Sequence, residues 1–319
     1  MKFFFGISCL FIFFSEPIIG QEKPTFPPYT IESTYLKLKK KHPFISPIKP
    51  LKSKSIKSKE NIVFKKINGK KLKLDIYIPK RNNTETFPAV LLIHGGGWLT
   101  GSKENERPMA QQLAMNGYVG ITVSYRLGSE ATYPAAVNDL KDAIVWAKKH
   151  AKKYNINKDK IAVLGASAGA QLATLIGVTP NSPIFNIDKQ FSNQVQAIVN
   201  VDGIVSFIHP EAESESKTGK VSMADIWLNG SKNENFKNWK EASPLEYVNK
   251  NTPPIIFINS SQPRFHAGRD DMVSKLNGFN IYHEIHIIPN SPHSFWLVHP
   301  WFDTTLNYTL NFLNYILKP

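Results

Sequence analysis

The chain has 319 residues, 42% of them hydrophobic, a formal net charge of +14 and one cysteine. This length and apolar content allow a substantial buried core, and we expect one large domain preceded by an N-terminal extension. A single cysteine excludes an internal disulfide, so the stability of the protein depends on its core.

The N-terminus has the composition of a signal peptide. Met1 and Lys2 precede an apolar run from Phe3 to Phe14, which is shorter than the roughly 18 residues of a membrane-spanning helix. We therefore predict a signal peptide over residues 1–20, cleaved near Gly20 or Gln21, and export to the periplasm or the medium. No later segment is apolar enough to predict a transmembrane helix.

Positive charge is concentrated in one stretch of the chain. Residues 36–81 hold sixteen Lys and Arg against Glu60 and Asp75, while the remainder is nearly neutral. We expect residues 21–59 to form a basic extension, flexible or lying along the surface of the protein, followed by a folded domain over residues 60–319. The basic stretch could contact an acidic polysaccharide or an anionic membrane surface, or simply be solvated. It lacks interleaved aromatic residues and a reading motif, so nucleic acid is not an expected partner.

Apolar segments indicate the fold class. Residues 61–64 and 72–78 flank Asn68 and Gly69 as in a β-hairpin. After them, strands are expected at residues 89–93, 118–125, 161–164, 195–201, 255–259 and 282–288, and helices at residues 107–115, 135–153 and 304–317. This alternation predicts an α/β fold in which helices cover both faces of a mostly parallel, eight-stranded sheet with an N-terminal antiparallel edge hairpin. Residues 203–250, with a short helix near residues 223–228, interrupt the rhythm as a small cap or a solvent-exposed connection.

Two glycine-rich motifs follow expected strands. Gly165-Ala166-Ser167-Ala168-Gly169 lies between a strand and a helix, as in a nucleophile elbow that exposes the serine hydroxyl. His94-Gly95-Gly96-Gly97-Trp98 follows an earlier strand, and its unshielded amides could stabilise an oxyanion. We assign Ser167 as the nucleophile, and Gly96, Gly97 and Ala168 as the oxyanion-hole residues. Trp98 could form a wall of the substrate site.

A serine nucleophile also needs a base and an acid. His293 lies after the last expected strand and before the final helix, the position in which this class of fold carries its base. Its carboxylate partner is ambiguous. Asp202 directly follows a strand, whereas Asp270 and Asp271 lie late in the loop after the next strand and could cap a helix. The sequence leaves Asp202 and the pair equally supported, with Asp270 preferred within the pair. Trp296, next to the base, is a further candidate for substrate binding.

These motifs, over residues 60–317, resemble the α/β-hydrolase superfamily, and more narrowly the secreted bacterial esterases that include feruloyl and acetyl-xylan esterases. The resemblance implies ester hydrolysis through an acyl-enzyme, with no metal and no organic cofactor. The family places its acid where this chain has Gln262-Pro263-Arg264, which keeps the acid open.

The expected substrate is a small acyl ester, with an acetyl or feruloyl group on a plant polysaccharide that could itself be acidic or acetylated. Alternatives are a peptidase or lipase of the same fold, or a catalytically impaired binding protein. The sequence leaves the oligomeric state open.

Overall fold

The computed structural model describes residues 26–80, 85–185, 188, 190–214 and 221–318. The expected signal peptide at residues 1–20 lies outside this part. None of the helices in the described ranges combines the length and the apolar character that a membrane crossing requires.

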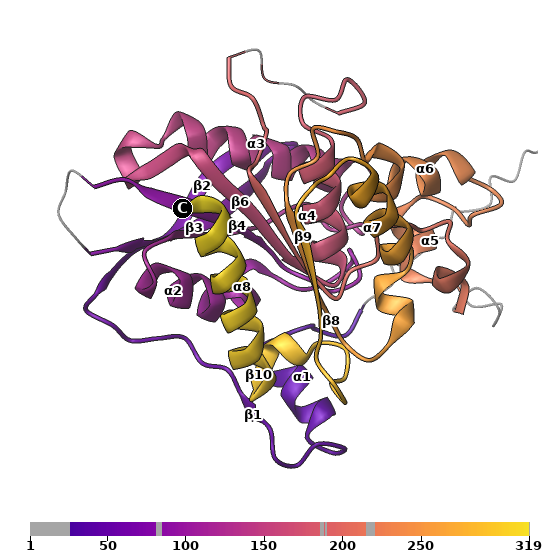
Figure 1. The fold of residues 1–319 in the computed structure, drawn as a ribbon, viewed down its shortest axis with the longest axis horizontal. Helices are drawn as coiled ribbons and strands as arrows, with labels where there is room; N and C mark the ends of the chain where they lie inside the picture. The colour runs from indigo at the N-terminus through magenta and orange to yellow at the C-terminus, as the bar shows by residue number, and fades with distance from the viewer. Residues whose placement is uncertain (1–25, 81–84, 186–187, 189, 215–220, 319) are drawn as a thin grey trace, which may run out of the picture.

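An eight-stranded sheet forms the centre of the molecule (Figure 1). Its order is β2-β3-β5-β4-β6-β7-β8-β9, with antiparallel pairing of β2 with β3 and of β3 with β5, and parallel pairing elsewhere. The strands are β2 (Ile56–Ile67), β3 (Lys70–Pro79), β4 (Phe87–Ile93), β5 (Val119–Val123), β6 (Ile156–Ala166), β7 (Ala197–Val201), β8 (Ile255–Asn259) and β9 (His283–Ile287). The predicted fold class, including the edge hairpin, is confirmed.

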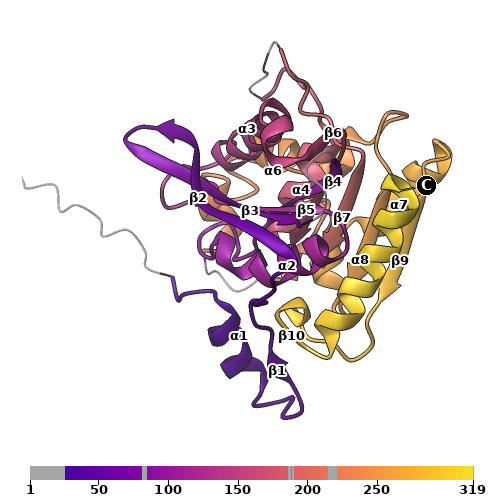
Figure 2. The same ribbon diagram turned by 90° about the vertical axis from the view of Figure 1, so that its left-hand side faces the viewer.

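Helices cover both faces of this sheet because its central strands bury side chains on both sides (Figure 2). In β4, Leu91 and Ile93 join one hydrophobic cluster, while Val90 and Leu92 join the other. The first cluster includes residues of α3 (Ala135–Lys149), α4 (Ala168–Val178) and α7 (Arg269–Gly278), and the second includes residues of α2 (Arg107–Met115) and α8 (Trp301–Leu317).

The described part of the N-terminal extension over residues 21–59 is folded onto the domain, so of the two expectations the flexible extension is wrong. It forms α1 (Ile31–Leu38) and β1 (Ser46–Pro47), and β1 pairs with β10 (Val298–His299) near the C-terminal helix. Ile45 and Ile48 are buried in the same cluster as α8. Lysines dominate this segment, but the apolar residues between them are enough to anchor it.

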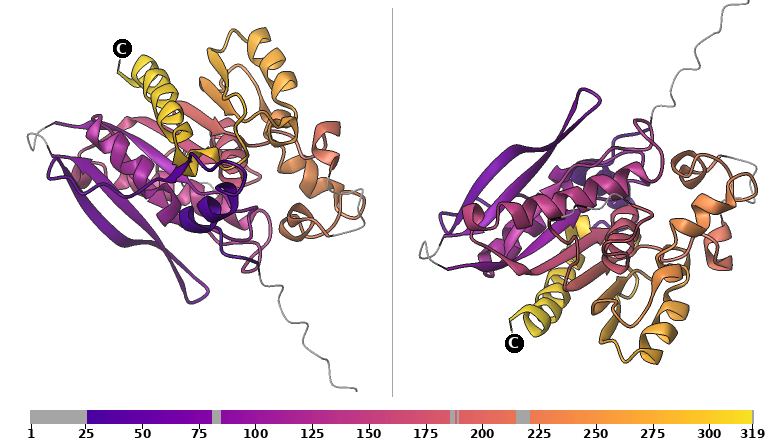
Figure 3. Two further views of the ribbon diagram at one scale, coloured as in Figure 1. Left: turned by 90° about the horizontal axis from the view of Figure 1, so that it is seen from below. Right: turned by 90° about the horizontal axis from the view of Figure 1, so that it is seen from above.

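The insertion at residues 203–250 contains α5 (Met223–Trp227) and α6 (Phe236–Glu241). Figure 3 shows this orange segment on the outside of the sheet and its covering helices. Trp227 and Trp239 are buried and belong to the same hydrophobic cluster as α3 and α4. The segment is therefore packed against the domain, as expected of a small cap, and its described part is not a loose connection.

Candidate active site

Ser167 occupies a strained turn between β6 and α4. Its backbone angles are φ 55° and ψ −122°, a conformation that an L-residue adopts only when its surroundings enforce it. A Cβ on Gly165 would come within 2.0 Å of the Gly169 carbonyl oxygen, and one on Gly169 within 2.1 Å of the Ile93 carbonyl oxygen. Both flanking positions thus require glycine. The turn exposes the serine hydroxyl above the sheet, as the motif predicts.

The Ser167 hydroxyl lies within hydrogen-bond distance of an imidazole. Its Oγ is 2.8 Å from Nε2 of His293, and Nδ1 of the same ring is 2.7 Å from Oδ2 of Asp202. Because a carboxylate only accepts hydrogen bonds, the proton is on Nδ1 and the lone pair of Nε2 faces the hydroxyl. These three side chains have the arrangement of a serine–histidine–acid triad.

Asp202 is held in place on both sides. It is fully buried at the end of β7, and its second oxygen, Oδ1, accepts a hydrogen bond from the Ser260 amide at 2.9 Å. Its φ of 53° is unusual for a non-glycine residue, and its own amide donates to the Ile258 carbonyl. The end of β8 therefore orients the carboxylate that follows β7.

Asp270 and Asp271 do not contact His293, and their assignment as acid candidates is wrong. The Asp270 side chain is 76% exposed in the first turn of α7, where Arg269 binds it at 2.8 Å and lowers its pKa. Asp271 is also exposed, and its carboxylate lies 3.5 Å from His209. Both residues lie in the first turn of α7, which agrees with the alternative that they cap a helix.

The loop after β8 gives the base an aromatic neighbour. Phe265 stacks on His293 with a centroid separation of 3.5 Å and an interplanar angle of 7°. Trp296 meets the same imidazole edge-on at 5.1 Å, but it is only 3% exposed and belongs to the core. The expected substrate contact of Trp296 is therefore wrong, because the indole packs behind the ring. Phe265 was not predicted as a site residue, since no motif in the sequence marks this position.

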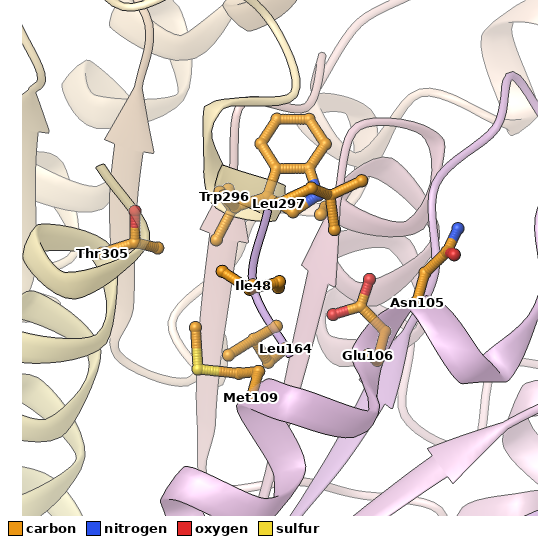
Figure 4. Close-up of a pocket in the computed structure, with 10 residues that line it drawn as sticks. Ile48, Asn105, Glu106, Met109, Leu164, Trp296, Leu297 and Thr305 are labelled. Atoms are coloured by element: carbon orange, nitrogen blue, oxygen red, sulfur yellow. The ribbon is translucent and has the colours of Figure 1, made fainter. Parts of the chain in front are cut away.

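Behind Trp296 lies a small buried cavity (Figure 4). Ile48, Met109 and Leu164 are among its apolar lining residues, and Glu106 is among its polar ones. Burial raises the pKa of Glu106 to about 8. This carboxyl group is thus largely protonated at neutral pH.

The glycine triplet lies directly beside Ser167. A Cβ on Gly95 would be 3.1 Å from Cβ of Ser167, so glycine permits the close approach. Gly96 and Gly97 have φ angles of 119° and 58°. Among the backbone hydrogen bonds that turns and loops form in the described residues, none is donated by the amide of Gly96 or Gly97. Together with the amide of Ala168, at the start of α4, they remain the candidate oxyanion donors.

The side chain of His94 contacts the backbone of this loop. It is buried, which lowers its pKa to about 4, and its Nδ1 is 2.8 Å from the Gly95 carbonyl oxygen. The ring stacks on Tyr125 at 4.4 Å, and the Tyr125 hydroxyl donates to the His94 carbonyl. A neutral histidine in this position has a structural role.

Two residues of α5 contact the glycine triplet and the tryptophan that follows it. Trp98 stacks on Trp227 of α5 at 5.1 Å, and its Nε1 donates to Gln171. The sulfur of Met223 would lie 2.1 Å from a Cβ on Gly97, so the thioether packs on that glycine. Trp98 therefore connects the cap to the site, and Met223 is a contact that the sequence did not reveal.

Comparisons with known proteins identify the family of this chain. The BD-FAE family model matches residues 74–275. The chain is 29% identical over 217 residues to LipM, a probable carboxylic ester hydrolase of Mycobacterium tuberculosis, covering 66% of this chain and 48% of LipM. It is 41% identical over 109 residues to an arylesterase of Saccharolobus solfataricus, covering 34% and 35% of the two chains. The chain thus spans about half the length of LipM and about a third of the arylesterase.

Solved structures show the same fold. A thermophilic esterase of Thermogutta terrifontis aligns with a TM-score of 0.67 and 24% identity over 84% of this chain and 94% of its own. A truncated carbohydrate esterase from gut microbiota aligns with a TM-score of 0.68 and 20% identity over 85% and 99%. Because the family model covers more than half of the chain, the protein belongs to the BD-FAE family of α/β-hydrolase-type esterases.

Proposed function

We propose that this protein is an exported serine esterase that removes small acyl groups, with acetyl as the preferred group, from a plant polysaccharide. The observation that carries the esterase reaction is the hydrogen-bonded series of Ser167, His293 and Asp202 beside the glycine triplet. The family membership of the chain supports the same reaction class.

In the proposed reaction, His293 carries each proton between the reacting groups. His293 Nε2 removes the proton from Ser167 Oγ as this oxygen attacks the ester carbonyl carbon, and Asp202 stabilises the resulting imidazolium. The amides of Gly96, Gly97 and Ala168 bind the oxyanion. The imidazolium then protonates the leaving alcohol, which departs and leaves an acyl group on Ser167. Water, deprotonated by the same nitrogen, attacks this acyl group. The bond from the acyl carbon to Ser167 Oγ then breaks, the imidazolium returns its proton to Oγ, and the carboxylic acid is released.

The contacts of Met223 and Trp98 support a small acyl group. The Met223 sulfur packs on Gly97, one of the two glycines whose amides would bind the oxyanion, and Trp98 is fixed by Trp227 and Gln171. Side chains this close to the oxyanion hole limit the space beside a bound carbonyl group. Bulkier acyl groups, feruloyl included, would require Met223 to move.

A polysaccharide substrate is supported by two features. One structural neighbour is named a carbohydrate esterase, and the β2–β3 hairpin carries exposed lysines that suit an acidic polymer, among them Lys57, Lys59 and Lys66. Export rests on the composition of residues 1–20.

Ester hydrolysis is tested with p-nitrophenyl acetate, butyrate and octanoate. We expect the rate to fall with acyl length and to be lost in Ser167→Ala. Equal rates for the wild type and Ser167→Ala would reject the serine esterase, and rates that rise toward octanoate would indicate a lipase. Acetate release from acetylated xylan and pectin, compared with hydrolysis of methyl ferulate, tests the acyl group and the polymer. Export is tested by N-terminal sequencing of the mature protein, which should begin near Gln21.

A further inference from the structure

The segment before α1 runs along the catalytic site. The amide of Tyr29 donates to Thr100 Oγ1 at 3.4 Å, and Asn105 Nδ2 donates to the Tyr29 carbonyl at 3.0 Å. The Thr100 hydroxyl in turn donates to the Pro27 carbonyl at 3.3 Å. Pro27 and Tyr29 are thus hydrogen-bonded to Thr100 and Asn105, which follow the glycine triplet.

The Tyr29 ring lies next to the turn of Ser167 and the glycine triplet. Its Cε1 is 3.5 Å from the position that a Cβ on Gly95 would take, and Cβ of Ser167 is 3.1 Å from the same point. A side chain at Gly95 would therefore meet both residues. The ring fills space next to the nucleophile and against the glycine triplet.

The Tyr29 hydroxyl reaches the loop of the base. It lies 3.1 Å from Oγ of Ser294, the residue directly after His293. Ser294 is only 8% exposed and has a φ of 72°, a conformation that a serine keeps only when its surroundings enforce it. Burial raises the pKa of Tyr29, so its hydroxyl remains protonated and able to donate.

We propose that Tyr29 is a positioning residue, which fixes the loop of His293 relative to the glycine triplet through its hydrogen bond to Ser294. The inference rests on the proposed esterase function of Ser167 and His293. It assigns a role in the reaction to the N-terminal segment, for which the sequence predicted a basic extension and no catalytic role.

The role follows from what the triad requires. Asp202 and Phe265 fix the ring of His293, but the backbone of its loop must also stay in register with the oxyanion donors on a different loop. A displacement of this loop would lengthen the contact between Ser167 and His293 and slow proton transfer, with little effect on substrate binding. Loss of the Tyr29 hydroxyl should therefore lower kcat more than it changes KM.

The test compares Tyr29→Phe with Tyr35→Phe, a matched control. Tyr35 lies in α1, and its ring packs against the hydrophobic cluster that contains α8. Steady-state rates with p-nitrophenyl acetate are normalised to the fraction of enzyme that a serine-directed organophosphate titrates. We expect Tyr29→Phe to lower kcat about fivefold, the effect of one neutral hydrogen bond, at nearly constant KM. Tyr35→Phe should keep the wild-type kcat.

A double-mutant cycle with Ser294→Ala tests the stated contact. If Tyr29 acts through Ser294, the double variant should be no slower than the slower single variant. Effects that multiply would overturn the proposal, as would an unchanged kcat in Tyr29→Phe or an equal loss in Tyr35→Phe. These outcomes differ from failure of the proposed function, in which the wild type would not exceed Ser167→Ala.

Discussion

Replacing Asp202 by Asn tests the assignment of the acid directly. Asn has nearly the same shape, and its amide oxygen can still accept the hydrogen bond from the Ser260 amide, now made to Oδ1 of Asp202 at 2.9 Å. Its NH₂ group then faces His293 Nδ1, now 2.7 Å from Oδ2. Since that group is a donor, Nδ1 must accept and the ring proton moves to Nε2.

The consequence for the rate follows from this tautomer. With a proton on Nε2, the nitrogen that lies 2.8 Å from Ser167 Oγ can no longer accept the hydroxyl proton. Loss of the correct tautomer in a serine triad lowers kcat by about 10⁴-fold. This corresponds to about 5.5 kcal/mol of transition-state stabilisation. KM should change much less, because Asp202 is fully buried behind the imidazole.

The assay is steady-state hydrolysis of p-nitrophenyl acetate, with circular dichroism to verify folding. Asp270→Asn is the matched control, because the Asp270 carboxylate is largely exposed and bound to Arg269, and it should leave kcat within about twofold of the wild type, as surface substitutions usually do. A folded Asp202→Asn enzyme with more than a tenth of the wild-type kcat would show that Asp202 is not the acid of the triad. So would a comparable loss in Asp270→Asn.

Three further substitutions probe the surroundings of the site. Met223→Ala removes the side chain that packs on Gly97, and should raise kcat/KM for p-nitrophenyl butyrate relative to acetate by about tenfold, whereas an unchanged ratio would contradict the acyl-size argument. Gly96→Ala would place a Cβ 2.1 Å from the Thr100 carbonyl oxygen, so the loop must shift and kcat should fall by about 10²-fold or more, and a near-normal rate would argue against this oxyanion donor. Burial raises the pKa of Glu106 to about 8, so the folded protein retains a proton that the unfolded chain releases, and this group contributes stability that is lost as the pH rises from about 4.5 to about 8. The melting temperature of Glu106→Gln relative to the wild type should therefore be higher at pH 8 than at pH 5 by about 2 °C or more, and a pH-independent difference would show that this carboxyl group ionises normally.

The sequence determined the fold class and the two glycine motifs because these depend on local patterns. Short apolar strands alternating with helices specify a parallel sheet with buried faces, whichever residues fill the loops. The turn at Ser167 and the triplet after His94 require glycine where the backbone approaches closely, and this requirement is visible in the sequence itself. His293 could be placed from its order in the chain.

Which carboxylate serves as the acid, and how the N-terminal segment packs, became clear only from the tertiary contacts. Asp202 and Asp270 both follow strands in the sequence, and only the side-by-side pairing of β7 with β8 brings one of them to His293. Lysine content suggested a flexible extension, yet a few apolar residues, Ile45 and Ile48 among them, attach it to the core and bring Tyr29 to Ser294. Contacts between segments far apart in the chain depend on how those segments pack, and the composition of each segment does not predict them.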